Sequence, residues 1–408
     1  MIEEGEARKR ILDATSMGPV VSCCLSDALG SHVAVDVSAQ VDLPGFDNSE
    51  MDGYAVRAED ADKVGAQLVV TGEQAAGADL GLSVGEGEAL RIFTGAPIPH
   101  GADAVIMQED VKVIGEEGDN KQRIEIVEAV SEVGEFIRRR GADVCVGQKI
   151  VSAGEKITPG RVGLLASQGL GEVKVHQAPR VAVVTTGDEL VEAGTELGDG
   201  HIFNSNAPML AALVKSIVDC EANLFHARDD ETILKDTLKM ALDEHDVVLI
   251  AGGVSVGDHD LVKEMLTELG VKTDFWRVQI KPGKPFLFGR CGETQVFGLP
   301  GNPVAAYTTF LLFVASALRK WSGAADQDGE ALPLPRVKCR LGEKVDYSDG
   351  HRPHYMRGCL QEKDGIFMPV GLQASHAIFG LSRADALLRV EPGTVLEAGV
   401  EVDALRLP

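Results

Sequence analysis

Residues 181–190 read VAVVTTGDEL, a short apolar run followed by a polar loop that contains one glycine and two carboxylates. The same arrangement recurs in DVVLIAGGVSVGDHD (246–260) and QVFGLPGNP (295–303). Segments with helical periodicity follow these runs, at about 206–218, 259–269 and 304–321. Buried apolar strands that alternate with helices are typical of a parallel sheet covered on both faces. The sequence therefore predicts a doubly wound, mostly parallel α/β domain over residues 178–330.

The rest of the chain has the pattern of β-structure. Between 47 and 140, short apolar runs alternate with glycine-rich turns, which predicts an inserted β-rich module. Residues 331–408 return to short alternating strands, which predicts a separate small C-terminal β domain. Residues 1–46 and 141–177 are left as a linking region that begins with a short amphipathic helix. The expected fold class is α/β plus β, in several domains.

The composition excludes several classes of function. The 408 residues contain 39 Lys and Arg against 63 Asp and Glu, for a net charge of −24. Clustered basic residues supply most of the affinity for DNA and anionic membranes, so neither nucleic acid nor membrane is an expected partner. The first residues lack the features of a signal peptide, and the longest apolar run, 310–317, is far shorter than the roughly 20 residues of a spanning helix. Seven scattered cysteines form no CxxC motif, which favours the reducing cytoplasm over a disulfide framework or a zinc site.

The three polar loops are the expected binding site, because ligands bind beyond the carboxyl ends of the strands in an open parallel sheet. Glycines at such positions let backbone amides approach a phosphate, although a plain tight strand-to-helix connection is the alternative. The loop at 252–257 is neither a Walker A motif nor a dinucleotide fingerprint, since it lacks the Lys-Ser/Thr pair and its glycine spacing differs. The expected substrate-binding residues are Gly252, Gly253, Ser255, Gly257, Pro300, Gly301, Asn302 and Pro303.

Carboxylates are frequent in and near the same loops. Carboxylate oxygens beside a phosphate are the usual ligands of Mg²⁺, which keeps several of its waters. For each carboxylate alone, a helix cap or a solvated surface position is the alternative. Together they favour a Mg²⁺ site, and the candidates are Asp188, Glu189, Asp229, Asp258 and Asp260.

Two lysines three residues apart, Lys281 and Lys284, lie in a turn that prolines stiffen. Such a turn suits a small oxyanion, because ordering it costs little entropy. A solvated basic turn is the alternative. Downstream, Arg352 and Arg357 would add a guanidinium fork, although a surface location is the more ordinary interpretation.

Three features of the β-rich module are ambiguous. Asp52, near Ser49, and Thr94 lie in turns whose polar groups have a structural role more readily than a functional one. For the arginines at 138–140, a salt-bridged loop and a ligand clamp agree equally with the sequence. No Ser-His-Asp order supports nucleophilic catalysis.

Taken together, these motifs resemble one family, the molybdopterin molybdenumtransferases, which include MoeA and the gephyrin E domain. The matching stretches run in family order across almost the whole chain. They are PGFDNS (44–49), MDGYAV (51–56), TGAP (94–97), RRRG (138–141) with Asp143, TGDEL (186–190), GGVSVG (252–257), KPGKP (281–285) and GLPGNP (298–303).

The resemblance implies an elongated protomer whose α/β domain is of the molybdopterin-binding type. It implies a homodimer, with residues 1–46 and 141–177 in the dimerisation region and the active site between one subunit's α/β domain and the partner's β-rich module. The implied reaction inserts molybdate into adenylylated molybdopterin and releases AMP, with Mg²⁺ present. Contact with the upstream adenylyltransferase is a further partner to consider.

The family's functional residues are implied at matching positions. Those used for activity are Asp52, Thr94, Asp143, Glu189, Asp229 and Asp260, of which Glu189, Asp229 and Asp260 are the metal ligands. The molybdate pocket corresponds to Lys281, Lys284, Arg352 and Ser375, and Pro300 and Pro303 shape the pterin-side loop. Two departures concern charge: Glu50 adds an acid beside Asp52, and Asp258-His259 precedes Asp260 where the family varies.

Two other functions stay open at this point. The upstream molybdopterin adenylyltransferase carries similar glycine loops, but it resembles a single compact domain. A non-catalytic scaffold, like the gephyrin E domain at synapses, would bind a receptor peptide instead. The sequence does not separate molybdate from tungstate.

Overall fold

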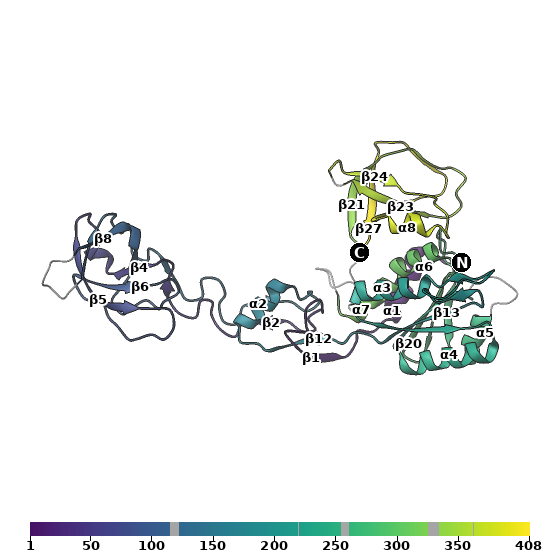
Figure 1. Cartoon of the computed structure of the whole chain (residues 1–408), viewed down its shortest axis with the longest axis horizontal. Coiled ribbons are helices and arrows are strands. Elements are labelled where there is room, and N and C mark those ends of the chain that lie inside the picture. The colour runs from purple at the N-terminus through teal and green to yellow at the C-terminus, as the bar shows by residue number, and fades with distance from the viewer. Residues whose placement is uncertain (115–121, 219, 254–260, 325–333, 362) are drawn as a thin grey trace. The chain divides into compact units, whose positions relative to one another are not determined.

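The computed structural model describes residues 1–114, 122–218, 220–253, 261–324, 334–361 and 363–408. These residues pack into two compact units (Figure 1). The first unit contains residues 1–35, 152–166 and 170–408, and the second contains 36–151 and 167–169. The α/β region and the C-terminal β region therefore lie in the first unit, and the β-rich module lies in the second.

A mixed sheet forms the centre of the first unit. It contains the strands predicted from the three apolar runs, which are β13 (Val181–Thr186), β17 (Val247–Ala251) and β20 (Thr294–Leu299). The strand order is β16-β13-β17-β20-β19-β18. The first four strands are parallel, whereas β19 (Leu287–Cys291) pairs antiparallel with both β20 and β18 (Lys272–Trp276). The predicted doubly wound, mostly parallel α/β domain is confirmed.

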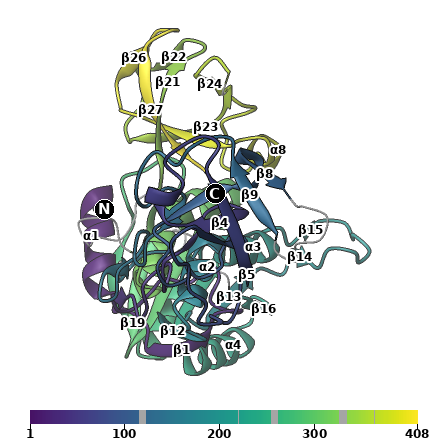
Figure 2. The ribbon, with the colours of Figure 1, turned by 90° about the vertical axis from the view of Figure 1, so that its left-hand side faces the viewer.

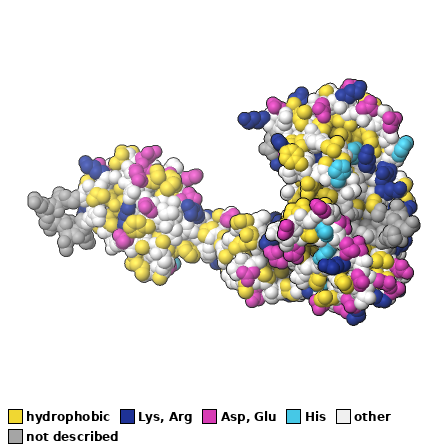
Figure 3. Space-filling model, turned by 45° about the vertical axis from the view of Figure 1, so that its right-hand side comes forward, with side chains coloured by type: hydrophobic (Ala, Val, Ile, Leu, Met, Phe, Trp, Pro, Cys, Tyr) yellow, Lys and Arg dark blue, Asp and Glu magenta, His cyan; other side chains and the backbone are white. Residues whose placement is uncertain are grey.

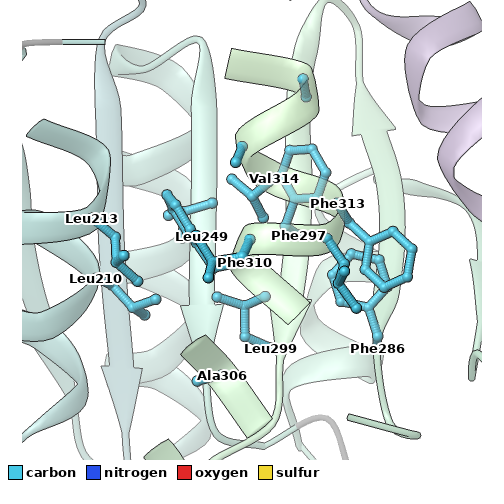
Figure 4. Packing of buried hydrophobic residues seen from close by; sticks show 14 of the residues in the cluster. Leu210, Leu213, Leu249, Phe286, Phe297, Leu299, Ala306, Phe310, Phe313 and Val314 are labelled. Carbon is cyan, nitrogen blue, oxygen red and sulfur yellow. The ribbon is translucent and has the colours of Figure 1, made fainter. Parts of the chain in front are cut away.

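Helices cover both faces of this sheet. Successive residues of a strand point to opposite sides, and in the central strands both sets of side chains are apolar and need to be buried. Val183 and Leu249 belong to the buried cluster on one face (Figure 4). Helical segments on that side are α1 (Glu4–Ala14), α3 (Asn206–Val218), α6 (Pro303–Thr309), a π-helical stretch (Phe310–Val314) and α7 (Ala315–Trp321). Val184 and Ile250 face the other side, where they pack with α4 (Glu231–Glu244) and α5 (Leu261–Glu268). The sheet, with the carboxyl ends of its strands, therefore lies between two layers of packed helices.

The C-terminal β region is a closed barrel with its own core (Figure 2). Its strands are β21 (Arg336–Leu341), β24 (Ile366–Pro369), β23 (His354–Gln361), β25 (Ala386–Val390) and β27 (Glu401–Arg406). A short ribbon, β22 (Val345–Tyr347) with β26 (Thr394–Leu396), and helix α8 (Ile378–Ser382) lie outside this closed sheet. The predicted small β domain is confirmed. A separate two-stranded ribbon, in which β1 (Val20–Cys24) pairs with β12 (Glu172–His176), lies near α2 (Pro159–Ser167) (Figure 1).

The second unit is built on a sheet in the order β7-β4-β6-β5-β9-β8. Its strands are β4 (Gly53–Val56), β5 (Gln67–Gln74), β6 (Glu88–Ile92), β7 (Ala104–Met107), β8 (Val111–Ile114) and β9 (Arg123–Ile126). Smaller pairings join β2 (Val37–Ser38) to β11 (Lys149–Val151) and β3 (Asn48–Ser49) to β10 (Ile137–Arg138). The β-rich character predicted here is confirmed.

The charged surface and the short helices are those expected from the high content of charged residues and from the short apolar runs of the sequence. Acidic and basic side chains are interspersed on the face of each unit that Figure 3 shows. Among the described residues, no helix combines the length and the apolar character that crossing a bilayer requires.

Candidate functional site

A pocket of about 490 Å³ opens at the carboxyl ends of the parallel strands. From β13 the chain crosses to β16 (Ala222–Ala227) on one side and then returns to β17 on the other. This reversal creates the crevice in which open α/β sheets bind their ligands. The lining comes from the ends of four strands and includes Thr186, Gly187, Glu189, Asp229, Gly252, Gly253 and residues 300–303.

The two glycines that follow β17 are required by the backbone and by close packing. Gly253 has a φ of 61°, and a Cβ at this position would collide with the side chain of Val262. Gly252 has a φ of 103°, and a Cβ there would lie 2.9 Å from the Thr186 carbonyl oxygen. The tight connection and the ligand site thus coincide, because both glycines also line the pocket. The predicted residues Ser255, Gly257, Asp258 and Asp260 lie outside the described residues.

Glu189 and Asp229 bring their carboxylates to the same pocket from the loops after β13 and β16. The Thr186 hydroxyl donates a hydrogen bond of 2.8 Å to Asp229 Oδ1, which orients that carboxylate. Asp188 has another contact, since its Oδ1 accepts from the Asp229 amide at 3.3 Å. Asp188 therefore shapes the turn and is not part of the pocket lining.

This donor set fits Mg²⁺, which is commonly held by one or two carboxylates together with substrate phosphates. Glu189 and Asp229 would supply those carboxylates. Within the described part of the chain, no three His, Cys, Asp or Glu side chains are grouped as an all-protein metal site would require.

Two asparagines that the sequence analysis missed organise the rim of the pocket. Asn206, 8% exposed, donates to the Gly301 carbonyl oxygen at 2.6 Å and so ties helix α3 to the loop after β20. Its Oδ1 is buried without a partner among the described groups. Asn204 donates to Thr185 Oγ1 at 2.8 Å and accepts from the Ala207 amide at 3.1 Å. An Asn-Ser-Asn sequence just before a predicted helix was the available signal.

The turn with the two lysines is joined to the start of barrel strand β23. The Lys281 amide donates to the Pro353 carbonyl oxygen at 2.8 Å, and the Tyr355 amide donates to the Lys281 carbonyl oxygen at 2.8 Å. Lys284 is exposed and directly precedes Pro285, which lines the pocket. The predicted lysine pair therefore lies between the pocket and the barrel.

Arg352 and Ser375 reach the same region from the barrel. Arg352 Nη1 donates to the Ile280 carbonyl oxygen at 2.8 Å, one residue before Lys281. Ser375 Oγ accepts from Asn302 Nδ2 at 3.0 Å, and Asn302 lines the pocket. The residues that the resemblance assigned to molybdate thus come from three segments that the fold brings together.

Lys281, Lys284 and Arg352, here called the cation cluster, form no ion pair with any described acid. Other described basic side chains, such as Lys9 and Lys272, also lack an acidic partner, and what distinguishes these three is their place beside the pocket. The cluster is consequently suited to an external anion.

Arg357 does not form the fork that the sequence suggested. It is 2% exposed, and its guanidinium donates to the carbonyl oxygens of Leu372 and Ala374. Arg357 therefore braces the loop that carries Ser375 and does not itself face an anion.

In the second unit, Thr94 donates both its amide and its hydroxyl to Asp52 Oδ1, at 2.8 Å and 2.9 Å. These two bonds hold the pKa of the Asp52 carboxyl below its usual range, so this exposed side chain stays charged. Asp143 is also exposed, and its amide donates to the Leu43 carbonyl oxygen at 2.9 Å.

The arginine triplet, Arg138–Arg140, is a salt-bridged segment. Arg139 pairs with Asp47 at 2.6 Å, and Arg140 pairs with Asp42 at 2.6 Å. Arg138 lies 3.7 Å from Glu50, so the charge of this unusual acid is offset locally. Of the two interpretations left open by the sequence, the described contacts favour the salt-bridged loop.

Three family models match successive parts of the chain, which together contain the regions described above. The model of the MoeA N-terminal region (domains I and II) matches residues 2–169, that of a probable molybdopterin-binding domain matches 182–320, and that of the MoeA C-terminal region (domain IV) matches 339–407. The chain is 36% identical over 393 residues to a molybdopterin molybdenumtransferase of Nostoc sp., covering 93% of this chain and 87% of the relative. The chain belongs to the MoeA family. A relative of the same name from Haemophilus influenzae is 35% identical over 372 residues, covering 90% and 88%.

Solved structures of MoeA-family members agree. A molybdopterin biosynthesis MoeA protein from Pyrococcus horikoshii superposes with a TM-score of 0.82 at 32% identity, covering 100% of both chains. A molybdenum cofactor biosynthesis protein from Pyrococcus furiosus, 21% identical with a TM-score of 0.60 over 100% of both chains, shares the fold. Because the match extends over all parts of the chain, it disfavours the single-domain adenylyltransferase that the sequence had left open.

Proposed function

We propose that this chain is a molybdopterin molybdenumtransferase, which inserts molybdate into adenylylated molybdopterin and releases AMP. The observation that carries the proposal is the cation cluster. Lys281, Lys284 and Arg352 lack acidic partners among the described residues, and they lie beside a pocket with glycine amides and two carboxylates. One region thus offers positive charge for an oxyanion next to groups suited to a phosphoanhydride.

The side chains act mainly by positioning and by electrostatics. Gly252 and Gly253 allow the phosphoanhydride to approach the backbone, and Asp229, oriented by Thr186, fixes the acidic side of the pocket. Lys281 and Arg352 hold molybdate, while Asn206 fixes the 300–303 loop. Mg²⁺ bound at Glu189 and Asp229 would neutralise phosphate charge.

The test is AMP release by the purified protein from adenylylated molybdopterin with Mg²⁺, with and without molybdate. We expect release that depends on molybdate. Retained binding of the pterin substrate without any release would contradict the transferase and support the scaffold alternative.

A matched pair of neighbouring aspartates tests the acidic side of the pocket. Asp229→Asn should lower kcat for AMP release about 100-fold, because it removes a charge from the reacting region. Asp230→Asn makes the same change one residue on, where the side chain caps helix α4 by accepting from the Ile233 amide at 2.9 Å. It should leave kcat within twofold, and equal losses in both variants would contradict a specific role for Asp229.

We also propose a homodimer in which Asp52 and Thr94 complete the active site of the partner subunit. The exposed, charge-stabilised Asp52 supports this arrangement, because its carboxylate accepts from Thr94 and forms no ion pair with a basic group among the described residues. Asp52→Asn and Asp229→Asn chains, each nearly inactive alone, should regain about a quarter of wild-type activity after subunit exchange, since half of the dimers would then contain one intact site. No recovery, with exchange verified by mass spectrometry, would place both residues in the site of one subunit.

A further inference from the structure

Tyr347 touches two members of the cation cluster at once. Its hydroxyl donates to the Arg352 carbonyl oxygen at 2.9 Å. The Lys281 ammonium lies 5.1 Å from the centroid of its ring. Tyr347 is half-buried at the end of β22, so one rigid side chain contacts both the Lys281 ammonium and the Arg352 backbone.

The ring of Tyr347 is itself held firmly. Its backbone pairs with Thr394 of β26, and its carbonyl oxygen accepts from the Gly350 amide at 3.0 Å. A Cβ at Gly350 would collide with the ring, so the glycine allows the chain to pass directly against it. The imidazole of His354 lies 5.1 Å from the ring, centroid to centroid. The ring therefore has little freedom to turn away from Lys281.

The neighbouring His354 does not add to the positive charge. It is 5% exposed, and burial, followed by the charges of Lys281 and Arg357, lowers its pKa to about 4. At neutral pH the ring of Tyr347 thus neighbours a neutral imidazole and an ammonium group. This surrounding suits a cation–π contact with Lys281.

We propose that Tyr347 is a positioning residue for the oxyanion, which fixes the Lys281 ammonium with its ring and the Arg352 backbone with its hydroxyl. A lysine side chain has four rotatable bonds, and ordering it on binding lowers affinity unless the free protein already holds it. The inference rests on the proposed function, because it takes molybdate as the anion that the cation cluster binds. It goes beyond that function by assigning molybdate affinity to a residue that does not itself touch the anion.

The experiment measures molybdate binding to the full chain by calorimetry and the KM for molybdate in AMP release. Tyr347→Leu should raise Kd and KM about tenfold, because it removes the ring and the hydroxyl. Tyr347→Phe keeps the ring and should raise both values about twofold to threefold. The kcat at saturating molybdate should change less than twofold in either variant.

Tyr355→Phe is the matched control. It also removes a tyrosine hydroxyl from the barrel, but that hydroxyl donates to Glu4 Oε2 at 2.6 Å. We expect a lower melting temperature and an unchanged Kd for molybdate. A rise in Kd equal to that of Tyr347→Phe would show that general loosening of the barrel explains the effect, and would overturn the inference.

The other outcomes are also decisive. If the wild type does not bind molybdate, the assignment of the cation cluster fails and this inference fails with it. If the wild type binds molybdate and Tyr347→Leu binds it within twofold as tightly, only the inference on Tyr347 is overturned. Should Tyr347→Leu not fold, an unchanged Kd in folded Tyr347→Phe overturns the hydroxyl's part, and a raised Kd with unchanged kcat supports it.

Discussion

The arginine triplet and the cation cluster are both basic, yet they differ in what neutralises them. Each arginine of the triplet lies beside a carboxylate, from Glu50, Asp47 or Asp42. The cation cluster contacts one backbone carbonyl oxygen, through Arg352, and one aromatic ring, through Lys281, and it pairs with no described acid. The triplet is neutralised by its own structure, whereas the charge of the cluster stays available to an external anion.

The largest expected effect comes from reversing one charge in each group. Lys281→Glu should weaken molybdate binding on the order of 10³-fold, because it replaces an attraction by a repulsion. Arg139→Glu makes the same reversal in the triplet and should leave the Kd within twofold. Equilibrium dialysis with molybdate checks both, and comparable losses would show that pairing does not separate the two groups.

The second prediction concerns a proton added beside the cluster. The pKa of His354, about 4, lies below its ordinary value of 6.5 because of burial and of the nearby cations. Its contribution to stability is therefore fully present above pH 6.5 and is lost as the pH falls towards 4. Between pH 7 and pH 4.5 the free energy of unfolding should fall by about 2.5 kcal/mol more in the wild type than in His354→Phe.

Urea unfolding at the two pH values measures this difference. His32 is also buried, with a pKa of about 4, but it is present in both proteins and its contribution cancels. Identical pH dependence in the two proteins would mean that His354 is protonated without cost beside Lys281.

A third prediction gives the cluster the kind of partner that the triplet has. Ser375→Asp would place a carboxylate next to Asn302 and compete with the oxyanion for the cations, raising the Kd for molybdate about tenfold. Ser375→Asn has a similar size without the charge and should raise it no more than about threefold. A Kd for molybdate that is equal to or lower than that of the wild type in Ser375→Asp would show that the cation cluster does not face this loop.

The strands of the fold were predictable where burial is complete. β13 and β17 are buried along their whole length, so they appear in the sequence as continuous apolar runs. β16 was missed because it is an edge strand that contains Asn223 and His226 and is partly exposed. The C-terminal β domain followed from short alternating strands, although its closure into a barrel and its strand order depend on pairings that the sequence does not reveal.

Candidate residues of the site could be predicted only where the type of residue, without knowledge of its partners, indicates its chemistry. The glycines, the carboxylates and the lysine pair could be named because their chemistry is local. Charge pairing could not, since the partners are remote: Arg139 and Asp47 are 92 positions apart. Arg357 is the clearest case, because its position near Arg352 in the sequence suggested a ligand fork, whereas its burial makes it a brace for the loop that carries Ser375.

The smallest effect is expected from removing an acid from the triplet. The amide of Arg140 and the guanidinium of Arg139 hold the pKa of Asp47 below its usual range, so its stabilising contribution is present above pH 4 and is lost as the pH falls below that value. Because the pair is largely exposed, Asp47→Asn should lower the free energy of unfolding at pH 7 by no more than about 1 kcal/mol. The difference in stability between the wild type and the variant should shrink as the pH falls below 4, as urea unfolding can show. The variant also leaves Arg139 without its acid, and its affinity for molybdate should nevertheless equal that of the wild type. New binding of molybdate to this variant would mean that any unpaired arginine suffices, and that the geometry set by Tyr347 and the barrel is not what makes the cation cluster a site.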